Sequence, residues 1–176
     1  MRRSIALVAA SVAFVAAGAP HAATPIVYGY PYAADCPAAG IADAVDRWNM
    51  DECNCTSFVA WALSANGQRT DWFVPGAMDA FNWPHVAELA GLPVGTTPRV
   101  GAVVVWPHVK RFGHVAYVTA LDRDGRFDVA EYNLPVPFGF DVRRDVSRAG
   151  AEFIYVPAEP RAGASELRGR ASRPPG

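Results

Sequence analysis

The pattern of apolar and polar positions predicts helices in the first half of the chain. Apolar side chains at 58, 59, 61, 62 and 63 form the stripe of an amphipathic helix over 55–65. Asn66-Gly67 directly afterwards is typical of a helix end. A second helix is predicted over 77–90, where Pro84 suits the first turn.

From Val100 onward the pattern changes to short runs of β-branched and aromatic residues, which predict strands. The residues 123–126, "RDGR", form a turn signal that joins two of these strands into a hairpin. The predicted strands are 100–106, 114–121, 127–133 and 152–157. Helices followed by antiparallel strands predict a single α+β domain, with the N-terminal helices packed on one face of a small antiparallel β-sheet.

Both ends of the chain differ in composition from this domain. Arg2 and Arg3 precede an apolar run and then small residues, the pattern of a secretory signal peptide, which we place at 1–22. Residues 23–45 are expected to form an irregular lead-in that ends near a short helix at 41–48, before a domain at 46–157. The polar, Pro- and Gly-rich stretch 158–176 is expected to be a disordered tail.

Charge and hydropathy limit the partners that this protein can have. The formal net charge is −1 and no basic stripe is present, so nucleic acid is not expected as a partner. Beyond the signal peptide there is no second long apolar stretch, so we expect no stable membrane association after cleavage. We therefore expect a monomer that is secreted or resides in the periplasm or cell envelope, where disulfides form.

The candidate chemistry begins with a cysteine at the start of the first predicted helix. The helix dipole and the free N–H groups of the first turn favour the thiolate of Cys55 over its thiol. In the predicted hairpin, the start of strand 114–121 lies opposite the end of strand 127–133, so His114 should lie close to Glu131 and Asn133. A thiolate, an imidazole and an orienting carboxylate or amide are the groups that acyl transfer needs.

Four stretches carry a resemblance to a known family. "CNCTSFVAWAL" (53–63), "VGAVVVW" (100–106), "GHVAYVTAL" (113–121) and "VAEYN" (129–133) resemble, in order and spacing, the CHAP family of cysteine, histidine-dependent amidohydrolases/peptidases. The resemblance covers about 46–157 and implies a papain-like α+β fold that hydrolyses amide bonds in peptidoglycan. It implies that Cys55 is the nucleophile, that His114 is the base, and that Glu131 and Asn133 support them.

The residues beside the nucleophile depart from the family pattern. Cys53-Asn54 replaces the Gly-Gln that often precedes the family's cysteine, so Asn54 and Thr56 are the candidates for oxyanion or substrate contacts, and the completeness of the oxyanion hole is an open question. Some relatives bind calcium through acidic residues before the cysteine. Here Trp48 and Met50 interrupt the acidic alternation, so we expect neither a metal nor a cofactor.

Three cysteines cannot all pair within one chain. Thr56 and Phe58 match the family motif in the register of Cys55, which leaves Cys36 and Cys53 to form a disulfide. A zinc site made from the three cysteines and a histidine is disfavoured, because Cys-x-Cys is not the common ligand spacing.

The resemblance does not indicate which amide bond of peptidoglycan is cleaved. It covers both N-acetylmuramoyl-L-alanine amidases and endopeptidases that act on peptidoglycan stem or cross-bridge peptides. Two alternatives are a non-catalytic module of the same fold that binds peptidoglycan or a protein, and an amidase with a substrate outside the wall. The charged stretch 141–145, "DVRRD", is interpreted as a solvated loop.

Overall fold

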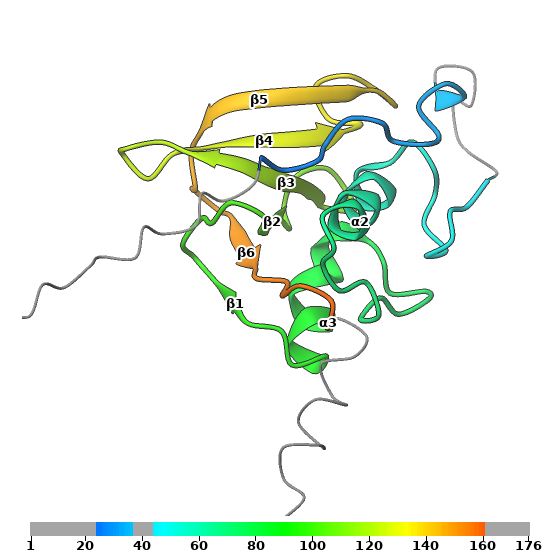
Figure 1. The fold of residues 1–176 in the computed structure, drawn as a ribbon, viewed down its shortest axis with the longest axis horizontal. Helices are drawn as coiled ribbons and strands as arrows, with labels where there is room; N and C mark the ends of the chain where they lie inside the picture. The colour runs from blue at the N-terminus through cyan, green and yellow to red at the C-terminus, as the bar shows by residue number, and fades with distance from the viewer. Residues whose placement is uncertain (1–23, 37–43, 161–176) are drawn as a thin grey trace, which may run out of the picture.

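The computed structural model describes residues 24–36 and 44–160 and has the predicted α+β architecture (Figure 1). The predicted signal peptide, residues 41–43 of the predicted short helix and nearly all of the predicted tail lie outside the described residues. The elements in chain order are α2 (Cys55–Ala65), the 3₁₀ helix η1 (Ala80–Asn82), α3 (Trp83–Leu89), β1 (Val94–Gly95), β2 (Val103–Trp106), β3 (His114–Leu121), β4 (Phe127–Tyr132), β5 (Phe140–Val146) and β6 (Glu152–Ile154).

Helix α2 has the predicted bounds, and its apolar stripe is buried except at Trp61, which is half-buried. It begins at Cys55 because Asn54 has an extended backbone, with φ −100° and ψ 163°. It ends where Asn66 donates from its backbone and its side chain to the carbonyl of Ala62, and Gly67 adopts the left-handed conformation that its missing side chain permits.

The second predicted helix is shorter than expected and is divided in two. Residues 77–79 are not helical, and η1 precedes α3. Pro84 lies in the first turn of α3, as predicted. It has no N–H to donate to the carbonyl of Ala80, so a continuous α-helix cannot run through this point.

The six strands of the described residues form one antiparallel sheet in the order β1-β6-β2-β3-β4-β5. The predicted hairpin is present: Leu121 pairs with Phe127 across the 123–126 turn, and a bulge shifts the register between Val118 and Ala120. Strand β2 is shorter than predicted at its start, and β6 is shorter at its end.

Two predictions from the polar segments are wrong. Residues 141–145 are not a solvated loop but belong to edge strand β5, whose Asp141 pairs with Glu131 of β4. The described part of the predicted helix 41–48 forms a turn closed by the bridge between Val45 and Asp51. In that turn the Asp46 side chain accepts hydrogen bonds from the N–H groups of Trp48 and Met50, which competes with helix formation.

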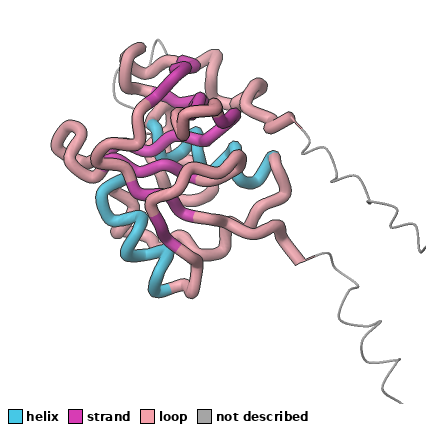
Figure 2. Tube along the Cα trace, turned by 90° about the vertical axis from the view of Figure 1, so that its left-hand side faces the viewer, coloured by secondary structure: helices cyan, strands magenta, loops and turns pink. Residues whose placement is uncertain are grey.

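The sheet separates two apolar clusters. One lies between the sheet and the helices and includes Phe58, Trp83 and Ile154. Figure 2 shows the helices beside the strands. The other lies on the opposite face, where Phe127 of β4 meets Phe153 of β6 with ring centroids 5.2 Å apart. Because β2 and β3 lie between these two strands, the sheet curls around the second cluster.

The lead-in is fixed to the start of α2 by a disulfide and by a tyrosine. Cys36 and Cys53 form the predicted disulfide, with Cα atoms 5.3 Å apart. The buried Tyr30 hydroxyl accepts a hydrogen bond from the N–H of Cys53 at 3.0 Å and contacts the Ser57 hydroxyl at 2.7 Å. These contacts hold the segment immediately before Cys55. No helix in the described part of the chain is long and apolar enough to cross a membrane.

Replacing both Cys36 and Cys53 by serine is expected to lower the free energy of unfolding by about 3 kcal/mol, because the disulfide closes a loop with a sequence separation of 17 residues. Urea denaturation followed by circular dichroism measures this loss. Dithiothreitol should shift the midpoint of the wild type to that of the variant and leave the variant unchanged. Equal midpoints of the oxidised wild type and the variant would show that the link contributes no stability.

Candidate active site

Three elements place the predicted thiol, imidazole and carboxylate at one point. Cys55 is the first residue of α2, His114 the first of β3, and Glu131 lies near the end of β4. The side chains of His114 and Glu131 are 1% and 0% exposed, whereas Cys55 is half-buried and is the free cysteine of the described residues. The geometry therefore combines a partly exposed cysteine with a buried supporting pair.

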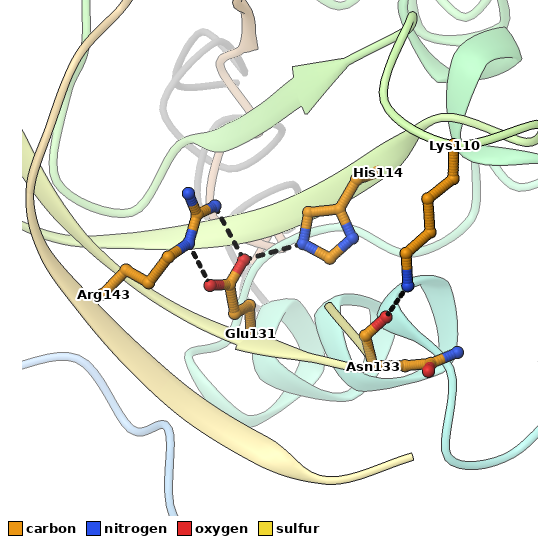
Figure 3. A network of polar contacts seen from close by, with 5 residues as sticks. All are labelled: Lys110, His114, Glu131, Asn133 and Arg143. Carbon is orange, nitrogen blue, oxygen red and sulfur yellow. Dashed lines mark hydrogen bonds and ion pairs between the residues drawn. The ribbon is translucent and has the colours of Figure 1, made fainter. Parts of the chain in front are cut away.

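The histidine joins the other two groups. Its Nε2 lies 2.7 Å from Oε2 of Glu131 (Figure 3), and its imidazole also interacts with the Cys55 thiol, whose pKa it lowers. Because Nε2 is occupied by the carboxylate, the ring nitrogen left for the sulfur is Nδ1. The order sulfur–imidazole–carboxylate is the arrangement of a nucleophile, its base and the group that orients the base.

Burial and contacts act in opposite directions on this pair. Burial disfavours the Cys55 thiolate, but the hydrogen bond and charge of His114 and the N–H groups of Val115 and Thr56 outweigh it, so the pKa of Cys55 is lowered. Burial likewise disfavours the imidazolium, but Cys55 and Glu131 outweigh it, and the pKa of His114 is raised. The two shifts together favour a thiolate–imidazolium pair over the neutral thiol and imidazole.

Arg143 of β5 is a fourth member of the site that the sequence analysis missed. Its Nη2 donates to Oε2 of Glu131 at 2.9 Å, and its Nε donates to Oε1 (Figure 3). Burial raises the pKa of Glu131, but His114 and Arg143 reverse the effect and the pKa is lowered overall. The carboxylate is therefore held in its charged form away from water.

The register of β5 explains how Arg143 reaches Glu131. Arg143 pairs with Val129, so it lies on the same face of the sheet as Glu131, one diagonal step away. Its guanidinium also lies 4.9 Å from the ring of Trp106, which stacks on the His114 ring at 6.0 Å. The alternation of Phe140 and Val142 with charged residues was the signal that could have revealed this strand.

Asn133 takes a different position from the one predicted. It follows the last residue of β4 with φ 57°, so its side chain leaves the face that carries Glu131. Its side-chain hydrogen bonds among the described residues go to Asn54 and to the N–H of Phe138, and none goes to His114. Its carbonyl accepts a hydrogen bond from Lys110 (Figure 3).

Cys55 lines an open cleft of about 520 Å³. Asn54, Cys55, Thr56 and Asn133 line it together with residues of the segments 49–51, 76–80, 112–113 and Phe138. The predicted oxyanion and substrate residues thus share one cavity with the predicted nucleophile. In the described part of the chain, no group of three or more His, Cys, Asp or Glu residues is placed to hold a metal ion.

The close approach of Phe81 explains why a glycine, Gly113, directly precedes His114. Gly113 has φ +74°, and a Cβ at this position would lie 2.6 Å from the backbone nitrogen of Phe81. The N–H of Phe81 donates to the carbonyl of Phe112, so η1 packs closely on the chain as it enters β3. A side chain at 113 would displace the backbone that places His114.

This fold, with a free cysteine at a helix start and a histidine on the adjacent sheet, defines a papain-like α+β domain. The model of the CHAP domain matches residues 45–133, and the chain belongs to the CHAP domain family. The family resemblance and the predicted fold class are therefore confirmed.

Individual relatives are similar over part of the chain. A putative hydrolase of Streptococcus mutans is 41% identical over 63 residues, which are 36% of this chain and 28% of that protein. The staphylococcal secretory antigen ssaA2 of Staphylococcus aureus is 35% identical over 80 residues, 44% of this chain and 29% of that protein. The chain thus spans less than a third of the length of these curated relatives.

A solved structure supports the fold. A Staphylococcus aureus N-acetylmuramoyl-L-alanine amidase superposes with a TM-score of 0.52 at 24% identity, over 59% of this chain and 30% of that one. At this level of identity the likeness concerns the fold.

The rate of Cys55 alkylation by iodoacetamide is expected to reach its midpoint at a lower pH in the native protein than in the urea-unfolded protein, because the pKa of this thiol is lowered. Peptide mass spectrometry after timed quenching gives the rate at each pH. His114→Ala should move the midpoint of the rate to higher pH. Identical pH profiles for native and urea-unfolded protein would rule out a perturbed thiol.

Replacing Arg143 by methionine should raise the pKa of Glu131, destabilise the His114 imidazolium and so move the alkylation midpoint of Cys55 to higher pH. In Arg143→Lys the alkylation midpoint should lie between those of the wild type and Arg143→Met, since a lysine keeps the charge but cannot make the bidentate contact with Glu131. Arg144→Met is the matched control, because Arg144 is exposed on the same strand. The same shift in both methionine variants would mean that the contact with Glu131 is not responsible.

Proposed function

We propose that this protein is an exported cysteine amidase or endopeptidase that hydrolyses amide bonds in bacterial peptidoglycan. The observation that carries the proposal is the buried His114–Glu131 pair, 2.7 Å apart, beside Cys55, whose pKa His114 lowers and which lines an open cleft. Membership of the CHAP family, and the amidase whose fold is similar, support the substrate class.

The proposed reaction has two stages. His114 accepts the proton of the Cys55 thiol, and the thiolate attacks the carbonyl carbon of a substrate amide. The tetrahedral intermediate collapses to a thioester as the C–N bond breaks, and His114 gives its proton to the leaving amine. A water molecule, deprotonated by His114, then attacks the thioester, and the carboxylic acid product and the Cys55 thiol are released.

The supporting groups do not form bonds to the substrate in this scheme. Glu131 holds the imidazole in orientation and stabilises its charged form, and Arg143 does the same for Glu131. The N–H groups at the start of α2 are the donors for the developing oxyanion. Thr56 is suited to this role through its backbone N–H, which already lowers the pKa of Cys55.

The compartment follows from two features. The predicted signal peptide at 1–22 and the Cys36–Cys53 disulfide both fit an oxidising location outside the cytoplasm, where peptidoglycan lies. The proposed substrates are the stem or cross-bridge peptides of peptidoglycan. We propose that the enzyme acts on them as a monomer, without a cofactor or a metal. The name of the S. aureus relative, a secretory antigen, supports export.

Purified peptidoglycan incubated with the protein should release soluble muropeptides, and mass spectrometry of the new termini identifies the bond. A free L-alanine amino terminus marks an amidase, whereas a terminus within the stem or bridge marks an endopeptidase. Cys55→Ala should reduce release at least about 10⁴-fold, because the nucleophile is removed. Circular dichroism checks that this variant is folded.

Equal release by the wild type and Cys55→Ala would contradict the proposed mechanism. Binding to the wall without release by either protein would instead favour the non-catalytic module.

A further inference from the structure

Asn133 is held rigidly at the mouth of the cleft. Its backbone N–H donates to the carbonyl of Gly139 at 3.0 Å, and its carbonyl accepts from Lys110 Nζ at 3.0 Å. Its side-chain Oδ1 accepts a hydrogen bond from the N–H of Phe138, also at 3.0 Å. The first two contacts hold the backbone of Asn133, and the third fixes the direction of its side-chain amide.

These contacts determine the orientation of a second amide, that of Asn54. A backbone N–H can only donate, so the atom of Asn133 that meets Phe138 is the oxygen, and the other end must be the NH₂ group. That NH₂ lies 2.5 Å from Asn54, and since it can only donate, Asn54 presents its oxygen. The NH₂ of Asn54 is therefore left as a donor without a partner among the described residues.

The same contact prevents Asn54 from capping α2. Asparagine immediately before a helix ordinarily accepts a hydrogen bond from an N–H of the first turn. Asn54 occupies that position and makes no such bond, because its oxygen is engaged by Asn133. The Asn54 NH₂ thus remains available on a residue that lines the cleft with Cys55.

We infer that the Asn54 side chain is a catalytic donor to the oxyanion that forms when Cys55 attacks an amide, and that Asn133 is its positioning residue. This inference rests on the proposed function. It gives Asn133 a role in the oxyanion hole instead of beside His114. It also shows how asparagine replaces the glutamine that commonly precedes the family's cysteine.

Three variants test the pair: Asn54→Ala, Asn133→Ala and the double variant. Removing one oxyanion donor lowers kcat by about 10²-fold to 10³-fold, so Asn54→Ala should lose about 10²-fold in muropeptide release. Asn133→Ala should lose at least about tenfold, and the double variant should be no more than about threefold slower than Asn54→Ala, since both act through one amide.

Asn133→Asp supplies an orientation control. Its carboxylate can still accept from Phe138, but it presents oxygen to Asn54 and should turn the Asn54 amide around. This variant should be at least as slow as Asn133→Ala.

Alkylation by iodoacetamide separates this role from a structural one, because that reaction forms no oxyanion. The rate and pH profile of Cys55 alkylation should stay within about twofold of wild type in Asn54→Ala and Asn133→Ala. Losses of hydrolysis and alkylation in parallel, additive losses in the double variant, or unchanged hydrolysis in Asn133→Ala would each overturn the inference. A wild type that hydrolyses no peptidoglycan would instead refute the proposed function.

Discussion

The buried contact between His114 and Glu131 is the constraint on which the rest of the structure depends. Removing a carboxylate from water costs several kcal/mol unless other charges and hydrogen bonds replace the solvent. Here His114 and Arg143 supply the replacement, and each comes from a strand adjacent to β4. The register of three neighbouring strands is therefore tied to one ionised group, and a shift of one residue would leave it unpaired.

The helix side of the site depends on the lead-in. Cys53 adopts φ 64°, an unfavourable conformation for a residue with a side chain, and its disulfide to Cys36 and its hydrogen bond to Tyr30 hold it there. This turn sets the direction from which the chain enters α2 and so places the sulfur opposite the imidazole. The lead-in is thus part of the architecture of the site, although its sequence has no regular pattern.

Sequence reasoning was most successful where local patterns are strong. The bounds of α2 and β3 follow from apolar periodicity and a helix-ending Asn-Gly, and the hairpin turn alone brought His114 near Glu131. It failed where tertiary contacts decide the structure. In edge strand β5 the run Arg143-Arg144-Asp145 obscures the alternation that Phe140 and Val142 begin, so Arg143 was missed. Asn133 leaves its expected face through a backbone dihedral that alternation cannot reveal.

The protonation state of His114 tests the central claim most directly. Nitrogen-15 NMR of histidine-labelled protein distinguishes imidazole from imidazolium, and the sequence contains four histidines that single variants can assign. The account predicts that His114 of the wild type keeps its second proton to a higher pH than an ordinary histidine, and loses it at a lower pH in Cys55→Ala, because the thiolate partner is gone. A His114 that titrates at the same pH in both proteins would contradict it.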